Sequence, residues 1–442
     1  MLLLYAVSPK RFKNFTLLIS SLIFYAWGEP RLVLLMLLTV FCGYILGLLT
    51  EKYQNTKKLF LALSVMLSLG FLVYFKYVDF FIENINAITG LSIPFLKVSL
   101  PIGISFYTFQ LLSYNIDVYR GNVAAQKNFV NLAAYISLFP QLIAGPIVRY
   151  SDVATQLVER THSFEKTSTG VRRFVLGLSK KILIANVLGE ICEIFKASND
   201  KSILFFWLYA VAFCLHVYFD FSGYSDMAIG LGKMLGFDFI ENFNYPYISK
   251  SITEFWRRWH ISLGSWFRDY VYIPLGGSRV GKMRMIFNIL IVWMLTGFWH
   301  GANWNFILWG LYFALLLVIE KVFLLKILKN SHVISRVYVL LLVIISFVIF
   351  NAASVKEACE YIGGMFGAGN YPLISVETVY YIKNYLFILI VAIIGATPIP
   401  KIISSKLKIS QWLEPIVLLA LLVIVTAYLV DGSFNPFLYF RF

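Results

Sequence analysis

The chain has 442 residues, of which 59% are hydrophobic and 14% charged, and its mean hydropathy is +0.75. Soluble domains have about a quarter charged and about half apolar residues, so this composition excludes an ordinary soluble protein. The formal net charge is +15, but the basic residues gather in short loops beside apolar runs. That distribution is typical of cytoplasmic membrane loops and does not indicate nucleic acid binding.

Apolar runs without a formal charge recur along the whole chain. Each is close to the roughly 17–25 apolar residues that cross a bilayer as a helix. The runs are continuously apolar, which favours helices over the alternating strands of a membrane barrel. We therefore predict an all-α polytopic integral membrane protein with roughly ten to twelve membrane-embedded helices. The runs cover residues 32–50, 98–116, 128–148, 203–219, 337–354, 384–400 and 415–430.

The chain begins with an apolar stretch, residues 1–8, that is too short to span a membrane. It has neither the basic region nor the cleavage site of a signal peptide. Two interpretations stay open: the stretch lies at the surface, or a preceding helix is absent from this sequence. The basic cluster of Lys10, Arg11 and Lys13 that follows predicts a cytoplasmic loop.

The run 128–148 carries the segment "YISLFPQLIAGPIVRY", in which Pro140 and Pro146 stand on either side of a glycine. Proline removes a backbone donor and breaks helices. The loops before and after this segment are both basic, so both are predicted to be cytoplasmic. We therefore predict a broken, re-entrant segment near 138–148. Such backbone is tolerated at membrane depth only when it is buried in protein or lines a cavity.

The region 236–284 mixes aromatic with basic residues in "SKSITEFWRRWHISLGSWFRDYVYIPLGGSR", and its interfacial helices are expected at 248–276. This pattern predicts amphipathic helices at the membrane interface. No polar stretch is long enough to form a separate soluble domain, so residues 1–442 are predicted to be one transmembrane domain. Within it we distinguish N-terminal helices at 1–130, a catalytic core at 131–320 and C-terminal helices at 321–442.

The four cysteines stand singly, without the spacing of a metal site or of a disulfide framework, and no metal is predicted. Phosphate-binding loops, zinc-protease motifs, serine elbows and dinucleotide fingerprints are all missing from the sequence.

One histidine, His300, lies inside "LTGFWHGANWNFILWG", within a stretch that has no charge from residue 285 to 319. Ionisable groups in spans are costly and usually face a protein interior or a water-filled cavity. The structural alternative is a neutral imidazole satisfied by a neighbour such as Thr296. The small residues beside His300 leave room for a substrate, which favours a functional role.

A second histidine, His260 in "FWRRWHISL", lies beside the predicted interface and taken alone is more typical of a structural residue. Together with His300 it would form a two-imidazole site, in which one ring takes a proton and the other orients a substrate. His162, His216 and His332 are weaker candidates because two lie in polar segments and one in an apolar helix.

The segment "HVYFDFSGYSDMAIGLG" places two aspartates in or near a span. Asp220 shares a helical face with Tyr224, and Ser222 shares one with Asp226. A polar stripe of this kind would line a substrate path. The structural alternative, which we favour for the aspartates, is ion pairing with Arg257, Arg258 or Arg268.

Five motifs are recognisable: "LPIGISFYTFQLLSYNIDVYRG", "LFPQLIAGPIVRY", "FDFSGYSDMAIGLGKMLGFDFIENFNYPYISKSITEFWRRWHISLGSWFRDYVYIPLGG", "LTGFWHGANWNFILWGLY" and "NPFLYFRF". They resemble the membrane-bound O-acyltransferase family, in its branch of alginate and peptidoglycan O-acetylation enzymes. The resemblance runs in register over nearly the whole chain.

The resemblance implies a ring of helices around a thinned central tunnel. It also implies that His300, in the W-H-G motif, is the essential residue, and that His260 lies in the same tunnel. The candidates for lining the substrate tunnel are Trp299, Trp259, Asn303, Ser222 and Asp226.

The function implied is transfer of an acyl group, expected to be acetyl from acetyl-CoA, to a hydroxyl of a cell-envelope polysaccharide or to an extracytoplasmic partner protein. His300 would deprotonate the hydroxyl, and His260 would hydrogen-bond the thioester carbonyl or hold the acceptor. No bound cofactor is expected. The expected location is the inner membrane of a bacterium, in contact with lipid. The alternatives are a D-alanyl transferase acting on teichoic acid and, in another class, a glycan or lipid transporter.

Two features depart from the family pattern. Many members have a further apolar helix before the "RFKN" cluster, and many have a second histidine where this chain has Phe313. The basic residues Arg172, Arg173, Lys180 and Lys181 have two interpretations: attraction of a phosphate-bearing donor, or simple cytoplasmic loop charges, which we favour.

Overall fold

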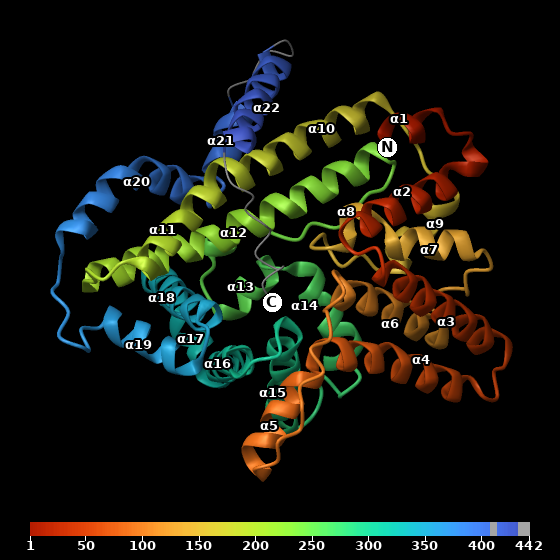
Figure 1. Ribbon diagram of the computed structural model, residues 1–442, viewed down its shortest axis with the longest axis horizontal. Helices are drawn as coiled ribbons and strands as arrows, with labels where there is room; N and C mark the ends of the chain where they lie inside the picture. Colours follow the sequence, from red (N-terminus) through yellow and green to blue (C-terminus); the bar gives the residue numbers. More distant parts are fainter. Residues whose placement is uncertain (407–412, 432–442) are drawn as a thin grey trace. The chain divides into compact units, whose positions relative to one another are not determined.

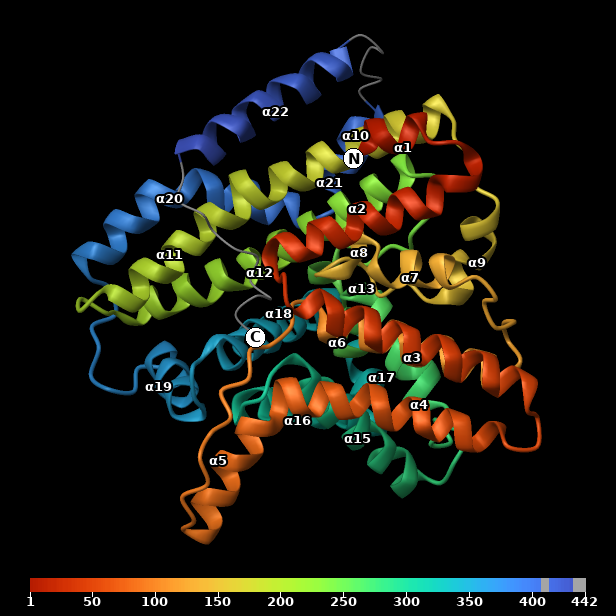
Figure 2. The same cartoon turned by 45° about the vertical axis from the view of Figure 1, so that its right-hand side comes forward.

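The computed structural model describes residues 1–406 and 413–431, and within these ranges every regular element is helical (Figures 1 and 2). The chain divides into two compact units. The first comprises Met1–Val171 with Ala228–Ile240, and the second comprises Arg172–Met227 with Glu241–Phe442. The motif "NPFLYFRF" lies outside the described residues. The division of 1–442 into N-terminal, catalytic and C-terminal parts stays a prediction.

The first unit contains the N-terminal helices. Helices α3 and α4 pack against each other and against α6, and α2 packs on α7. The elements are α1 (Leu2–Val7), η1 (Lys10–Phe12), α2 (Lys13–Gly28), α3 (Leu32–Lys52), α4 (Lys57–Leu72), η2 (Val73–Tyr77), α5 (Val78–Thr89), α6 (Ile104–Arg120), α7 (Phe129–Ser137), α8 (Phe139–Leu142) and α9 (Tyr150–Val158), followed by the start of α10 (Phe164–Ser179).

The second unit contains the segments that carry the predicted site. Its elements after α10 are η3 (Lys180–Ala185), α11 (Asn186–Ala197), α12 (Ile203–Met234, up to Met227), η4 (Pro246–Ile248), α13 (Ile252–Arg258), α14 (Ile261–Phe267), η5 (Arg268–Tyr272), α15 (Lys282–His300), α16 (Trp304–Ile319), η6 (Glu320–Leu324), α17 (Leu325–Leu328), α18 (His332–Asn351), α19 (Val355–Met365), α20 (Val376–Gly395), α21 (Ile399–Lys406) and α22 (Leu413–Asp431).

Seven helical segments among the described residues are long and apolar enough to cross a membrane. They are α3, the continuous helix Lys57–Thr89, α12, α15, α18, α20 and α22. Three further apolar helices, α2, α6 and α16, have 16, 17 and 16 residues and are slightly shorter. The all-helical, polytopic prediction is confirmed, and these ten helices agree with the lower end of the predicted number.

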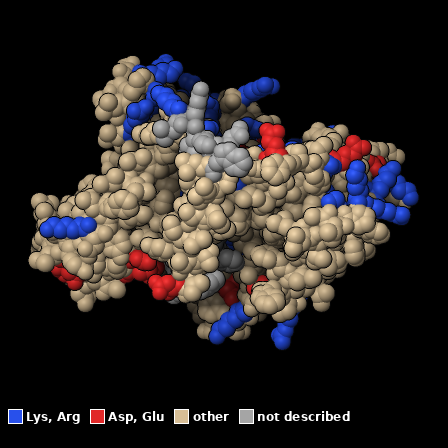
Figure 3. Space-filling model, turned by 90° about the horizontal axis from the view of Figure 1, so that it is seen from above, with Lys and Arg blue, Asp and Glu red and all other residues tan. Residues whose placement is uncertain are grey.

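The surface is largely uncharged, as a membrane protein requires. Figure 3 shows Lys, Arg, Asp and Glu in small areas, while the other residues cover most of that face. Long apolar side chains are exposed on the spanning helices, among them Leu34, Phe387 and Leu419 at 69%, 79% and 63%. Lipid tails would cover such a surface, because exposed apolar area of this extent is rare on soluble monomers.

The predicted break in the apolar run 128–148 is present. Helix α7 ends at Ser137, α8 is a single turn, and residues 143–149 form no helix. The Gln141 side chain donates to the carbonyl of Tyr135 at 2.6 Å, and the Tyr135 hydroxyl donates to the carbonyl of Val148 at 2.8 Å. Most of the broken backbone is buried in protein, as its depth would require. Its entry and exit on the cytoplasmic side stay a prediction.

The helix within the run 98–116 begins later than the hydropathy of the run predicts. Helix α6 starts at Ile104, after Pro101 and a Gly103 whose φ is +74°. That left-handed conformation suits glycine and ends any helix that approaches from the N-terminal side.

Residues 248–276 form short helices rather than one long element, and the first of them is fastened by a buried carboxylate. Glu320, wholly buried, accepts hydrogen bonds from the backbone N–H groups of Ile252 and Thr253 at 2.6 and 2.9 Å. It also accepts one from the Thr253 hydroxyl at 2.7 Å. These bonds satisfy donors that the first turn of α13 leaves without intrahelical partners.

We expect Glu320→Ala to lower the thermal midpoint in detergent, because it leaves three donors near α13 unsatisfied. Each such buried group costs about 1–3 kcal/mol. Glu320→Gln keeps one acceptor oxygen and is expected to fall between Glu320→Ala and wild type. The control is Glu360→Ala, which removes an exposed glutamate that pairs with Lys356 at 3.9 Å. A midpoint for Glu320→Ala equal to that of the control would contradict this role.

Candidate active site

His300 is the last residue of α15 and is 5% exposed. Three aromatic rings surround it: the ring centroids of Trp299, Trp309 and Phe350 lie 5.0, 5.1 and 5.3 Å from that of the imidazole. The Thr296 hydroxyl, considered above as a partner, donates to the carbonyl of Val292 at 2.7 Å. His300 therefore lies in a buried enclosure that these aromatic rings line in part.

The end of α18 is fixed beside His300 by an asparagine. The Asn305 amide is 1% exposed and donates to the carbonyl of Ala352 at 2.8 Å. Further contacts of 3.4 and 3.5 Å reach the carbonyls of Phe350 and Ile349. Because Phe350 is one wall of the His300 enclosure, Asn305 helps to determine the shape of that enclosure.

His260 stands between α13 and α14 and is 1% exposed. Its φ of +44° and ψ of +54° place it in the left-handed region, which is uncommon for a residue other than glycine. Nδ1 lies 3.1 Å from Oδ1 of Asn242. For Nε2 the described part of the chain supplies no hydrogen-bond partner.

One tryptophan connects the two histidines. The ring centroid of Trp299 lies 6.2 Å from that of His260 and 5.0 Å from that of His300. On its other side, the His260 ring meets Phe221 of α12 edge-on at 4.7 Å. The structure therefore brings together His260, Trp299 and His300, three of the residues that the sequence singles out.

Burial lowers the pKa of His260 to about 3. In the unfolded chain this histidine has the ordinary pKa near 6.5, so between pH 6.5 and 3 it binds a proton that the folded protein does not bind. The contribution of neutral His260 to the free energy of unfolding is therefore fully present above pH 6.5 and is lost as the pH falls from there toward 3. The slope for a single proton does not exceed about 1.4 kcal/mol per pH unit.

We expect the thermal midpoint of wild type to fall between pH 7 and pH 5, and that of His260→Gln to fall less. His332→Gln is the control, because His332 is exposed at the start of α18. Midpoints measured in detergent across this pH range test the expectation. Parallel curves for wild type and His260→Gln would contradict it.

Ser222 and Trp259 are buried, but they differ in their surroundings. Ser222 is 2% exposed, and its hydroxyl has no hydrogen-bond partner among residues 1–406 and 413–431. Trp259 belongs to the core of the second unit, stacked on Phe255 with centroids 5.5 Å apart and packed against Phe347. A tunnel role for either residue stays a prediction.

Asn303 is engaged as a helix cap. Its side chain accepts from the N–H of Asn305 at 3.5 Å at the start of α16, and its amide donates to the carbonyl of Ala353 at 3.2 Å. Its proposed contact with a substrate stays a prediction.

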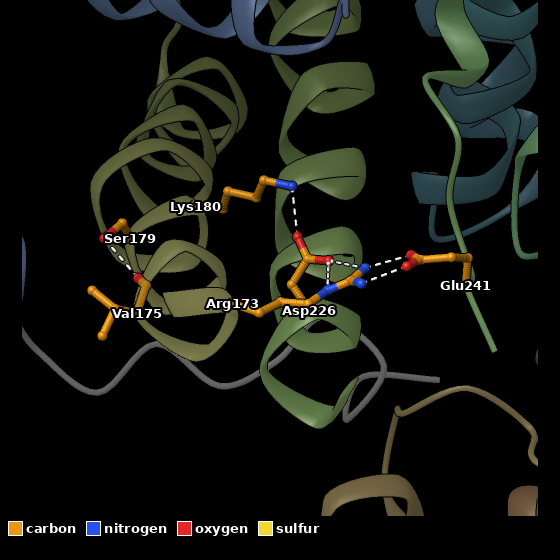
Figure 4. A network of polar contacts seen from close by, with 6 residues as sticks. All are labelled: Arg173, Val175, Ser179, Lys180, Asp226 and Glu241. Atoms are coloured by element: carbon orange, nitrogen blue, oxygen red, sulfur yellow. Dashed lines mark hydrogen bonds and ion pairs between the residues drawn. The ribbon is translucent and has the colours of Figure 1, made fainter. Parts of the chain in front are cut away.

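Asp226 lies in an ion-pair network, as the structural alternative proposed, but its partners are different from those predicted. Lys180 reaches it at 2.7 Å and Arg173 at 2.8 Å, and Arg173 also forms a bidentate contact with Glu241 (Figure 4). Of the predicted partners, Arg258 pairs with Glu254 and Arg268 with Asp269. Arg173 and Lys180 are the partners because helix α10 runs beside α12. The sequence alone does not show which helices lie side by side.

The basic cluster that follows α9 is electrically compensated. Lys181 pairs with Asp220 in the interior, and Arg172 contacts Glu414 at 2.9 Å. Together with the Asp226 network, these contacts give each of the four basic residues, Arg172, Arg173, Lys180 and Lys181, a carboxylate partner. Their attraction for a phosphate-bearing donor is correspondingly small.

Two of the other histidines, His216 and His162, are held by protein contacts. Nδ1 of His216 lies 2.6 Å from the carbonyl of Ala185, which makes it the satisfied core residue expected from its apolar helix. His162 lies 2.9 Å from the hydroxyl of Tyr5.

Sequence reasoning missed three residues that support the site: Asn305, described above, Asn242 and Glu320. Asn242 lies in the motif "ENFNYPY", which resembles the family but carries no catalytic pattern of its own. Glu320 ends the charge-free stretch 285–319, and an ionisable group at such a position is a signal that could have been used.

Fold and site together define a polytopic membrane protein in which two buried imidazoles, of His260 and His300, both pack against the ring of Trp299. Comparison with known proteins adds the family: residues 19–356 match the model of the membrane-bound O-acyltransferase family. The chain belongs to this family and is a multi-pass membrane acyltransferase. This finding favours the enzyme over the transporter.

The amino-acid sequence of this chain is similar to those of three bacterial relatives. The chain is 45% identical over 379 residues to the probable alginate O-acetylase AlgI of Azotobacter vinelandii, covering 84% of this chain and 76% of the relative. It is 31% identical over 490 residues to the peptidoglycan O-acetyltransferase of Helicobacter pylori, covering 99% and 93%. To the teichoic acid D-alanyltransferase of Bacillus subtilis it is 32% identical over 233 residues, covering 50% and 59%.

Proposed function

We propose that this protein transfers an acetyl group from acetyl-CoA to a hydroxyl of a cell-envelope polysaccharide, directly or through an extracytoplasmic partner protein. The observation that carries the proposal is the enclosed group of His260, Trp299 and His300 in a chain of this family. The names of the relatives support acetyl transfer, because the two with the broadest coverage above are an alginate O-acetylase and a peptidoglycan O-acetyltransferase.

The chemistry needs a base at a site without competing water. A neutral His300 takes the proton of the acceptor hydroxyl as its oxygen attacks the thioester carbonyl carbon. The carbon–sulfur bond then breaks, the thiolate takes the proton from the imidazolium, and the products are the acetyl ester and CoA. The aromatic walls of Trp309 and Phe350 keep water from hydrolysing the thioester in place of the transfer.

The proposed path is a tunnel through a thinned centre in a ring of helices, in the inner membrane of a bacterium. The donor enters from the cytoplasm and the acceptor from the opposite face. A broken, buried segment at 138–148 supports this view, since irregular backbone at membrane depth accompanies cavities or protein-filled interiors. A D-alanyl group delivered by a carrier protein is the second candidate, favoured by the similarity to the Bacillus subtilis enzyme over half of this chain.

Purified protein in lipid vesicles, supplied with labelled acetyl-CoA or with a D-alanyl-charged carrier protein, tests the proposal. Alginate oligomers and peptidoglycan strands serve as acceptors. We expect acetyl-CoA to be consumed and the label to appear as a base-labile ester on a glycan. Label from the D-alanyl carrier alone would establish the second candidate. Use of neither donor, also with envelope proteins of the host present, would contradict both.

A further inference from the structure

The contact between His260 and Asn242 determines which nitrogen of the imidazole carries the proton. Oδ1 of Asn242, a wholly buried side chain, lies 3.2 Å from the backbone nitrogen of Ser262. A backbone N–H can only donate, so the Asn242 atom at this position is the oxygen and accepts. The same oxygen accepts from the Ser262 hydroxyl at 2.9 Å.

Nδ1 of His260 lies 3.1 Å from that oxygen, so it carries a hydrogen and donates. The opposite arrangement would place the lone pair of Nδ1 against the lone pairs of Oδ1. It would also require the Ser262 hydroxyl to leave its 2.9 Å bond for a 3.3 Å contact with the imidazole. A neutral ring with its hydrogen on Nδ1 has a bare lone pair on Nε2.

The backbone of Asn242 fixes the same turn. Its carbonyl accepts from the N–H of Ile261 at 3.0 Å. Side chain and main chain of one residue thus hold both residues that follow His260, while His260 keeps a left-handed conformation that is energetically costly. Such strain persists only where surrounding contacts hold the conformation. The hydrogen bonds to Asn242 are among the contacts that hold it here.

Unsatisfied polar atoms mark the place where a ligand would bind. Nε2 of His260 and Nδ2 of Asn242 are both buried, and within the described ranges neither has a hydrogen-bond partner. Leaving such groups unpaired costs free energy, so a polar ligand group at this place would recover that loss.

We infer that Asn242 is a positioning residue that holds His260 as its Nδ1–H tautomer, so that Nε2 accepts a hydrogen bond from a second hydroxyl of the acyl acceptor, next to the one that His300 deprotonates. The inference rests on the proposed function for the identity of that hydroxyl. Of the two roles considered for His260, it selects the one that holds the acceptor, because a bare Nε2 has no hydrogen to donate to a thioester carbonyl.

Nitrogen-15 spectra of protein labelled at histidine test the tautomer without reference to activity. The signals of His260 are assigned by their loss in His260→Gln. At pH 7 we expect wild type to show a protonated Nδ1 and a bare Nε2. A protonated Nε2 in wild type would overturn the inference, whether or not any donor is consumed.

The variants connect the tautomer to the reaction. Asn242→Leu removes the acceptor oxygen, and we expect a shift of His260 toward the Nε2–H form with a fall in kcat of about 10-fold, the effect of losing one hydrogen bond to the acceptor. Asn242→Asp keeps an oxygen at the same place and is expected to restore the Nδ1–H form and most of kcat. Asn244→Leu is the matched control, because Asn244 lies on the same segment with its side chain exposed.

Equal tautomer populations in Asn242→Leu and wild type would overturn the positioning role, as would a failure of Asn242→Asp to restore the Nδ1–H form. If wild type shows the Nδ1–H form and the Asp variant retains it, but no acyl donor is consumed, the proposed function fails while the positioning of His260 by Asn242 stands. Spectra and turnover thus separate the two failures.

Discussion

His300→Ala is expected to reduce acetyl-CoA turnover by about 10²–10⁴-fold, the contribution typical of a general base. The reduction should appear in kcat with little change in the KM for the donor, because the imidazole acts on the attacking hydroxyl. Removing the ring from its aromatic enclosure also leaves a cavity beside Trp309 and Phe350, so the fold integrity of the variant is compared with wild type by thermal midpoint.

His332→Ala is the control for this experiment, since it removes a histidine that is exposed. We expect its turnover to match wild type. His300→Gln, which keeps a polar group of similar reach but no base, should be as inactive as His300→Ala. Turnover retained in both His300 variants would exclude His300 as the base and leave His260 as the imidazole to examine.

Much of the fold follows from hydropathy, and the deviations have local causes. Charge-free runs predicted α3, α12, α18, α20 and α22 because lipid demands continuous apolar length. Hydropathy failed where glycine and proline override it. The helix in the run 98–116 starts at Ile104, because Gly103 takes a left-handed φ of +74°.

The site was predictable in its histidines but not in their supports. A lone imidazole within an uncharged stretch is a strong signal by itself, which is why His300 was found. The contact between Asn242 and His260 joins residues 18 positions apart across a turn, and no periodicity encodes it. The same holds for Asp226: its ion pairing was anticipated, while Arg173 and Lys180 as its partners depend on how α10 lies beside α12.

The hairpin of α15 and α16 positions His300, and two glycines allow its helices to touch (Figure 1). A Cβ on Gly310 would lie 3.1 Å from the Cα of Gly297 and would also meet the carbonyl of Trp293. A Cβ on Gly297 would clash with the carbonyl of Phe306 and lie 3.2 Å from the Cα of Gly310. Backbone atoms cannot rotate away as side chains do, so the helices would have to separate.

We expect Gly297→Ala to destabilise the protein by about 3 kcal/mol, the upper end for overpacking, and to lower the thermal midpoint in detergent accordingly. Because Gly297 lies one turn before His300, separation of the helices should also displace the imidazole and reduce kcat. Gly310→Ala removes the same contact from the other helix and is expected to have a similar effect. Because both act on one contact, their effects in the double variant should fall short of additivity.

Gly70→Ala provides the matched control. Gly70 lies within α4, and a Cβ added there meets nothing within 4 Å. Alanine is the better helix former by about 1 kcal/mol, so this variant should be as stable as wild type or slightly more stable. If Gly297→Ala behaves like Gly70→Ala in both midpoint and kcat, the close approach of α15 and α16 does not hold His300 in place. A loss confined to Gly297→Ala and Gly310→Ala would instead show that the distance between these two helices sets the position of the catalytic base.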